Sequence, residues 1–270
     1  MAFPSSTLLF GAGKMGGAML EGWLAQGLPP ASLTVIDPMP SDSLKALAAK
    51  HGFALNPTAP KGPFAVIVLA IKPQMLEAAA PALKGLYDGS SLLVSVLAGK
   101  TMADLAGRLP GLTAIVRAMP NLPASVGRGV TGAATNAAAS KDQRQLADTL
   151  LKGIGRVEWV EGENMIDAVT AVSGSGPAYV FHLVECLTEA GIAEGLPRPV
   201  AERLARATIE GAGELLYRSD LSPETLRQNV TSPGGTTAAA LTVLMADNGL
   251  KPLMVKAVAA ARRRAEELSG

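Results

Sequence analysis

The stretch Thr7-Leu8-Leu9-Phe10-Gly11-Ala12-Gly13-Lys14-Met15-Gly16 decides the fold of the first half of this chain. An apolar, strand-forming run leads into glycines with the spacing GxGxxG, and a helix-forming segment, residues 14–26, follows. In such a turn Gly11 permits the tight reversal, Gly13 lets the backbone approach a diphosphate, and Gly16 lets the helix pack close to the sheet. The N–H groups and positive dipole end of the helix then favour a phosphate.

The surroundings of this loop strengthen an otherwise weak motif. In a chain with 29 glycines, GxGxxG is also compatible with an ordinary glycine turn. Here, however, strand-like and helix-like segments alternate, with strands expected at residues 7–10, 33–37, 64–71, 91–97, 113–118 and 157–161. The strands are nearly continuous in apolar residues, which is typical of parallel strands covered on both faces. We therefore predict an α/β fold that begins with a Rossmann-type doubly wound sheet binding a dinucleotide.

Asp37 is expected at the end of the second strand, about 20 residues beyond the loop. An acid at this position accepts hydrogen bonds from the adenosine ribose and would repel a 2′-phosphate, so Asp37 favours NADH over NADPH. No arginine lies nearby in the sequence to offset the carboxylate. The alternative is a turn aspartate preceding Pro38. Asn56, after the next helical region, is assigned to the adenosine side.

Further cofactor contacts are expected where the later strands end, because open α/β sheets bind ligands at that edge. These strand ends carry Ala70, Lys72, Pro73, Ala98 and Asn121. Each could also be a plain strand-terminating turn. Together, the glycine loop, the adenosine side and the strand ends give these cofactor-binding candidates: Gly11, Gly13, Lys14, Met15, Gly16, Asp37, Asn56, Ala70, Lys72, Pro73, Ala98 and Asn121.

The second half of the chain is expected to be helical. Long Ala- and Leu-rich segments occupy residues 163–172, 176–190, 198–217, 236–247 and 252–268. Caps support the assignment: Ser222 precedes Pro223 as an N-cap precedes a first-turn proline, and glycines punctuate several helix ends. We predict a domain boundary near residue 160, with a dinucleotide-binding domain at 1–160 and a helical domain at 161–270.

A small-residue turn, Ser232-Pro233-Gly234-Gly235-Thr236-Thr237, precedes a strong helix former. Its N–H groups at a helix start and its two threonine hydroxyls would suit a carboxylate, although a plain capping turn is the alternative. A second turn, Val172-Ser173-Gly174-Ser175-Gly176-Pro177-Ala178-Tyr179, also opens a helix. Its glycines favour close helix packing.

Composition excludes several classes of protein. The formal net charge of +1 provides no basic excess for nucleic acid or an anionic membrane. One cysteine excludes an internal disulfide and a cysteine metal cluster, and we expect no metal site. The longest apolar run is too short to cross a bilayer, and the start lacks the basic region of a signal peptide. We expect a cytoplasmic protein with a small-molecule substrate.

Four motifs together resemble the successive signatures of pyrroline-5-carboxylate reductases. They are Gly11-Ala12-Gly13-Lys14-Met15-Gly16, Arg117-Ala118-Met119-Pro120-Asn121, the 172–179 turn and Ser232-Pro233-Gly234-Gly235-Thr236-Thr237. They occur in the family's order and span nearly the whole chain. The last two are specific, whereas the first is shared with most dinucleotide enzymes.

The resemblance implies hydride transfer from NADPH or NADH to 1-pyrroline-5-carboxylate, giving L-proline. It implies a Rossmann domain, an all-α domain that forms a homodimer, and further assembly of dimers into rings. The active site would lie between the nicotinamide of one subunit and the helical domain of the other. Many members are described as NADPH enzymes, which leaves the preference suggested by Asp37 open.

The resemblance also assigns residues in the second half. The substrate carboxylate would lie on the Gly234–Thr237 turn, and Thr237 matches the family's threonine near the ring nitrogen. The substrate-binding candidates are Glu163, Ser232, Gly234, Gly235, Thr236 and Thr237, with Thr237 as the catalytic candidate. Asn229 corresponds to a polar residue near the cofactor.

Two other classes of function stay open at this point. A β-hydroxyacid dehydrogenase, or an imine reductase acting on another ring, would share the architecture. The hydroxyacid enzyme needs a lysine as general acid, and its candidates, Lys251 and Lys256, are expected at solvent positions. A non-catalytic nucleotide sensor would need no carboxylate-binding turn, so residues 232–237 argue against it.

Overall fold

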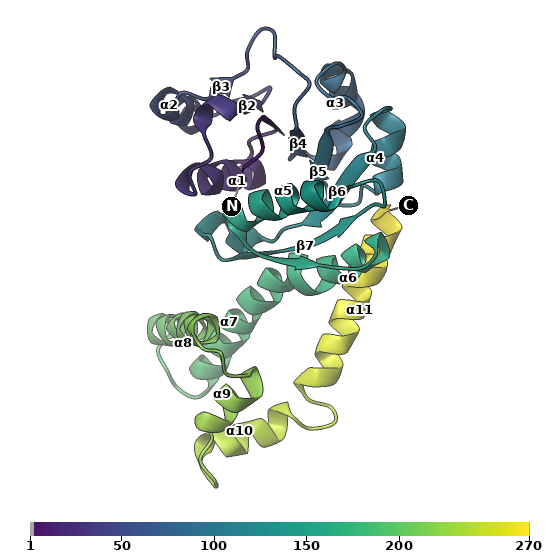
Figure 1. Ribbon diagram of the computed structural model, residues 1–270. Helices are drawn as coiled ribbons and strands as arrows, with labels where there is room; N and C mark the ends of the chain where they lie inside the picture. Colours follow the sequence, from purple (N-terminus) through teal and green to yellow (C-terminus); the bar gives the residue numbers. More distant parts are fainter. Residues whose placement is uncertain (1–2, 270) are drawn as a thin grey trace. The chain divides into compact units, whose positions relative to one another are not determined.

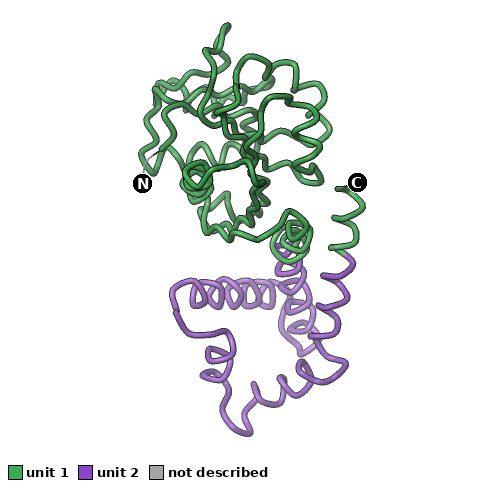
Figure 2. The backbone as a smooth tube through the Cα atoms, turned by 45° about the vertical axis from the view of Figure 1, so that its right-hand side comes forward, with its two compact units in different colours: residues 1–175, 261–270 green, residues 176–260 purple. Residues whose placement is uncertain are grey.

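The computed structural model describes residues 3–269, which form two compact units (Figures 1 and 2). The first unit comprises Met1–Ser175 with Ala261–Gly270, apart from the undescribed terminal residues, and the second comprises Gly176–Ala260. Residues 161–175 thus belong to the same compact unit as the sheet. The domain boundary near residue 160 stays a prediction.

The first unit is built on a sheet with the strand order β3-β2-β1-β4-β5-β6-β7-β8 among the described residues. The strands are β1 Thr7–Phe10, β2 Leu33–Ile36, β3 Ala54–Leu55, β4 Val66–Leu69, β5 Leu92–Ser95, β6 Ala114–Met119, β7 Gly129–Thr135 and β8 Gly155–Trp159. Neighbours are parallel except β6 and β7. The order reverses between β1 and β4, which is where a doubly wound sheet opens a ligand crevice.

The antiparallel strand β7 is a departure from the wholly parallel sheet that we predicted, and β3 was not expected either. The sequence of β7, GVTGAAT, lacks the β-branched and aromatic run that signals a strand. It is a strand because it pairs with β6 on one side and β8 on the other. Pairing partners distant in sequence, rather than local propensity, determine its conformation.

Helices cover both faces of the sheet, as predicted. In this unit they are α1 Lys14–Ala25, α2 Asp42–His51, α3 Leu76–Leu83, α4 Met102–Arg108, α5 Lys141–Leu151 and α6 Ile166–Val169. Several of these helices begin with side-chain caps. Ser41 caps α2, which ends at the left-handed Gly52, and Thr101 forms a complete capping box with Asp104 at α4.

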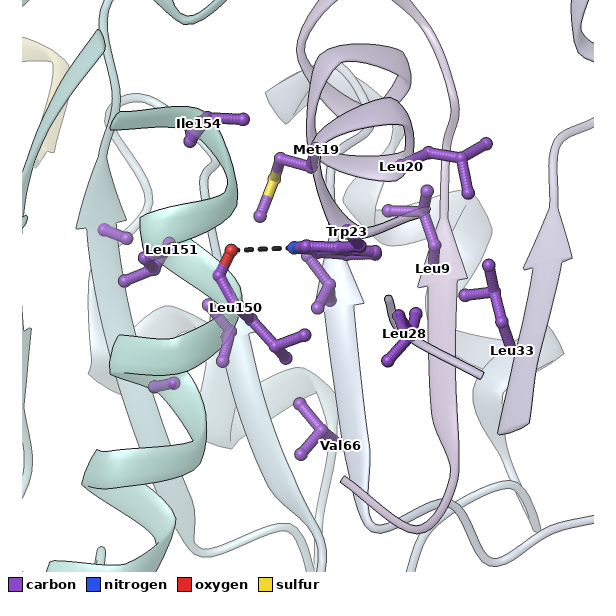
Figure 3. Packing of buried hydrophobic residues seen from close by; sticks show 14 of the residues in the cluster. Leu9, Met19, Leu20, Trp23, Leu28, Leu33, Val66, Leu150, Leu151 and Ile154 are labelled. Carbon is purple, nitrogen blue, oxygen red and sulfur yellow. Dashed lines mark hydrogen bonds between the residues drawn. The ribbon is translucent and has the colours of Figure 1, made fainter. Parts of the chain in front are cut away.

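Alternate residues of each central strand enter separate cores. Leu9 and Val68 join a cluster with residues of α1, α2 and α5, whereas Leu8 and Ile67 join one with residues of α3 and α4. Figure 3 shows Trp23 of α1 at the centre of the first cluster, where its indole N–H donates to the Leu150 carbonyl of α5 at 2.7 Å. This bond ties α1 to α5 and holds the glycine loop's helix against the sheet.

The mutation Trp23→Phe is expected to lower the free energy of unfolding by about 1–3 kcal/mol, because it removes this buried hydrogen bond and leaves a small void. Trp159→Phe is the matched control. It also removes an indole bond, to Asp148 at 3.0 Å, but from a half-buried ring, so it should lower stability by less than about 1 kcal/mol. Urea unfolding at one fixed protein concentration measures both. Equal losses would contradict the role given to Trp23.

The second unit is helical, as predicted. It contains α7 Gly176–Ala193, α8 Arg198–Arg218, α9 Pro223–Asn229, α10 Thr236–Leu244 and most of α11 Leu250–Ser269, whose last residues belong to the first unit. Ser222 caps α9 with Pro223 in the first turn. In α7 to α10 the buried side chains are Thr188, Ala201 and Ala205, so the unit has little core of its own. Over the described chain, no helix is both long and apolar enough to cross a membrane.

Candidate dinucleotide and carboxylate sites

The glycine loop lies between the end of β1 and the start of α1, at the point where the strand order reverses. Gly11 has φ +94°, and its N–H donates to the Ile36 carbonyl at 2.8 Å. A Cβ at Gly11 would lie 2.8 Å from the Ala70 carbonyl oxygen, whereas a Cβ at Gly13 would meet nothing within 4 Å. The loop is thus packed against β4 on one side and open at Gly13, which fits the close approach of a diphosphate.

Gly16 faces the loop from the first turn of α1. A Cβ there would collide with the Gly11 carbonyl oxygen and lie 3.1 Å from the Ala70 Cβ. The next residue differs, since a Cβ at Gly17 would lie at an ordinary 3.5 Å from the Ala12 carbonyl oxygen. The first helical turn can therefore accept a side chain at Gly17 and not at Gly16.

The mutation Gly16→Ala is expected to weaken dinucleotide binding about tenfold or more, because the loop must shift to relieve the collision. Gly107→Ala is the control: Gly107 lies in α4 and does not line the dinucleotide cleft, and a Cβ there would meet nothing within 4 Å, so binding should change by less than about threefold. Titration calorimetry with NADH and NADPH measures both. A similar loss in the two variants would show that packing of the loop does not set the affinity.

Asp37 follows β2 directly, and its carboxylate connects two backbone segments. Oδ2 accepts from the Ala12 N–H of the glycine loop at 2.7 Å, and Oδ1 accepts from the Met39 N–H at 2.8 Å. The second bond is the aspartate turn that was the alternative interpretation. Each oxygen retains a second acceptor position, so the turn leaves capacity for ribose hydroxyls.

Asn56 holds the Asp37 backbone through its side-chain amide. Its Oδ1 accepts from the Asp37 N–H at 2.8 Å, and its Nδ2 donates to the Asp37 carbonyl at 2.8 Å. Asn56 has φ +46°, a conformation that asparagine tolerates better than most residues. A direct contact between Asn56 and the cofactor stays a prediction.

A cleft of about 450 Å³ opens beside these groups. Its lining includes Gly13, Lys14, Asp37, Ser41 and Ser125, so it joins the glycine loop to the start of α2. Its volume is in the range of small-molecule sites. The described residues therefore fit a dinucleotide at this edge of the sheet.

The other strand ends lie at the same edge. Ala70 donates its N–H to the Phe10 carbonyl at 2.9 Å, which places it beside the glycine loop. Lys72 and Ala98 are exposed, Pro73 begins a short 3₁₀ turn, and Met15 is half-buried. Asn121 is 9% exposed, and its side chain accepts from the Val130 N–H and donates to Ser173, so part of its hydrogen-bonding capacity is used within the protein. Its contact with the cofactor stays a prediction.

Glu163 lies in a charged cluster within the first unit that was not predicted from the sequence. Its Oε1 accepts from the Met102 N–H at 2.7 Å and from Arg117 at 3.0 Å. Arg117, which is 3% exposed, also donates to Ser269 at 3.1 Å, and Ser269 donates to Asp167 at 3.1 Å. These contacts give Glu163 a structural role. Its role in substrate binding stays a prediction.

The carboxylate-binding candidate lies in the second unit. Gly234 has φ +70°, Gly235 donates to the Ser232 carbonyl at 3.0 Å, and Gly235 is the N-cap of α10 without a side-chain cap bond. The first N–H groups of a helix have no intrahelical acceptor, so α10 offers donors to an anion. Thr236 is exposed, Thr237 is half-buried, and Asn229 is the exposed last residue of α9.

Comparison with known proteins agrees with this architecture. Residues 163–268 match the family model for pyrroline-5-carboxylate reductase dimerisation, and residues 7–99 match that for coenzyme F420-dependent NADP oxidoreductases. A pyrroline-5-carboxylate reductase from Pseudomonas aeruginosa is 39% identical over 263 residues, covering 96% of this chain and 95% of the relative.

Solved structures extend the comparison to the whole fold. A pyrroline-5-carboxylate reductase from Coxiella burnetii is 37% identical with a TM-score of 0.90 over 99% of both chains. The pyrroline carboxylate reductase from Plasmodium falciparum, solved with NADP bound, is 26% identical with a TM-score of 0.76 over 100% of both. The sequence identity of 39% extends over 96% of the chain, and it agrees with the four motifs and the Rossmann-type sheet. This chain therefore belongs to the pyrroline-5-carboxylate reductase family.

Proposed function

We propose that this chain reduces 1-pyrroline-5-carboxylate to L-proline with a hydride from NADPH or NADH. The observation that carries the proposal is sequence identity of 39%, over 96% of the chain, to pyrroline-5-carboxylate reductases from Pseudomonas aeruginosa and Mycobacterium tuberculosis. The open glycine loop supports the dinucleotide, and the uncapped start of α10 supports the carboxylate.

The reaction needs alignment more than side-chain chemistry. A dinucleotide held by the glycine loop would supply the hydride for the carbon of the C=N bond, whose π electrons would move to nitrogen. The nitrogen carries the proton that completes the secondary amine. The protein's contribution is to hold the carboxylate on the N–H groups of Thr236 and Thr237 at the start of α10, which fixes the ring face that receives the hydride. Thr237 hydrogen-bonds the ring nitrogen, and Ser232 and Thr236 add polar contacts.

The second unit is proposed to pair with its counterpart in another copy of the chain. Large apolar side chains in it stay exposed, among them Phe181 at 56%, Val243 at 71% and Leu253 at 63%. A soluble helical unit with this much apolar surface is stable when a partner covers it. Rings of dimers and a cytoplasmic location belong to the same proposal. Sedimentation equilibrium tests assembly, and a monomer at micromolar concentration would contradict it.

The decisive assay follows oxidation of NADH and NADPH separately, with 1-pyrroline-5-carboxylate and with its six-membered homologue. We expect faster oxidation with the five-membered ring and recovery of L-proline. Oxidation with the six-membered ring alone would favour an imine reductase of different specificity. No oxidation with either would favour the hydroxyacid dehydrogenase or the nucleotide sensor, although Lys251 and Lys256 are both exposed.

A further inference from the structure

The Asp37 carboxylate is fixed in position before any ligand binds. Its two oxygens accept from Ala12 at 2.7 Å and Met39 at 2.8 Å, and its backbone N–H and carbonyl are both bonded to Asn56 at 2.8 Å. Four hydrogen bonds thus restrain one half-buried residue at the rim of the cleft. A restrained carboxylate pays little conformational entropy when it binds two ribose hydroxyls, and it cannot easily turn away from a phosphate.

The residues that follow Asp37 provide no cation for a 2′-phosphate, and the Ser41 and Ser43 hydroxyls that line the cleft are hydrogen-bonded to each other. Residues 38–44 contain no lysine or arginine. Asp42 is the first residue of α2, but its side chain is fully exposed and does not line the cleft. The nearest following cation, Lys45, is paired with Asp42 at 3.0 Å. A 2′-phosphate on the adenosine ribose would therefore meet the Asp37 carboxylate and not that of Asp42.

Lys14 is the cation that lines the cleft together with Asp37. It is the first residue of α1, and this helix start is where the diphosphate of a dinucleotide binds. The diphosphate is common to NADH and NADPH. A charge at Lys14 therefore raises the affinity for both cofactors without distinguishing them.

Resting on the proposed function, we propose that this chain selects NADH over NADPH, with Asp37 as the specificity-determining residue and Asn56 as the residue that positions it. Asn56 acts through Asp37, because both of its amide atoms are bonded to the Asp37 backbone. The relative solved with bound NADP is 26% identical to this chain, which leaves room for a different preference.

The first test is binding without substrate, by titration calorimetry of the full chain with NADH and with NADPH. We expect NADH to bind about tenfold or more tightly, because a phosphate beside a fixed carboxylate is strongly repelled. Asp37→Ser should remove most of this difference. Asp42→Asn removes an equal charge five positions away and should keep an NADH preference close to that of the wild type. NADPH binding as tightly as NADH to the wild type would overturn the proposal.

The second test separates positioning from folding. Asn56→Gly accepts the positive φ and removes the clamp, so it should reduce the NADH preference severalfold in the wild-type background. In the Asp37→Ser background it should leave the ratio of the two affinities unchanged, because the effect acts through the carboxylate. The same change of ratio in both backgrounds would overturn the positioning role. Circular dichroism confirms that each variant is folded.

Lys14→Met provides the remaining check, since it should weaken NADH and NADPH binding by the same factor. A selective loss of NADPH would assign Lys14 to the 2′-phosphate and contradict the proposal. None of these readouts depends on imine reduction. Preferential NADH binding without reductase activity would disprove the proposed function alone, whereas reductase activity with tighter NADPH binding would disprove the cofactor selection alone.

Discussion

The mutation Arg117→Met is expected to lower the free energy of unfolding by about 3 kcal/mol, because it leaves two partly buried acidic groups without their buried cation. The Arg117 side chain is 4% exposed, and it lies 3.0 Å from Glu163 and 3.5 Å from Asp167, whose side chains are 29% and 12% exposed. Ser269 completes the cluster by accepting from Arg117 and donating to Asp167. The last turn of α11 is thereby bonded to β6 and α6.

Arg108→Met is the control for the loss of an arginine. Arg108 pairs with Glu77 at 2.8 Å and with Asp104 at 3.5 Å, but Glu77 is 79% exposed. Surface pairs contribute little, so this variant should lose less than about 1 kcal/mol. Urea unfolding at one protein concentration compares the two. The double variant Arg117→Met with Asp167→Asn should recover part of the loss, because it removes one of the unpaired charges. A loss at Arg117 no larger than that at Arg108 would contradict the cluster's importance.

The mutation Thr237→Ala is expected to lower kcat for imine reduction about 100-fold, because it removes the hydrogen bond proposed for the ring nitrogen. Binding of NADH and NADPH should change less than about twofold, since the dinucleotide site is assigned to the first unit. Stopped-flow absorbance measures turnover, and calorimetry measures cofactor binding. Thr237→Ser keeps the hydroxyl and should restore most of the rate.

Thr242→Ala controls for changes within α10. Its hydroxyl donates to the Ala238 carbonyl at 3.1 Å in the exposed part of the helix, so the variant removes a threonine hydroxyl without altering the helix start. We expect its kcat to be within about twofold of the wild type. Unchanged turnover in Thr237→Ala would refute the catalytic assignment, and failure of Thr237→Ser to restore activity would mean that the methyl group, not the hydroxyl, matters.

The parts of the fold that the sequence predicts well are those with local causes. β1 has the expected bounds, and the glycine loop and the Ser222–Pro223 helix start occur where expected. Each depends on residues a few positions apart, so sequence spacing is enough to recognise them. Family membership could likewise be predicted from the sequence, because the family's motifs are short and contiguous.

The candidate site could be predicted only in part, because some of its contacts join residues that are distant in the sequence. The type of residue at Asp37 indicates ribose binding, but its restraint depends on Asn56, 19 positions later, and on Ala12, 25 positions earlier. Asn56 looked like a cofactor ligand, and the structure bonds its side chain to the protein. Glu163 looked like a substrate acid, and the structure pairs it with Arg117, 46 positions earlier.

The sequence by itself determined the Rossmann-type first half, the helical second half and the family, because periodicity, caps and contiguous motifs are local properties of the chain. Tertiary structure decided that the Gly- and Ala-rich β7 is a strand, that Arg117 meets Ser269 across 152 positions, and that Asn56 holds Asp37. These features arise when buried polar and backbone groups must find partners in the folded chain, and sequence spacing does not encode which distant partners come within reach.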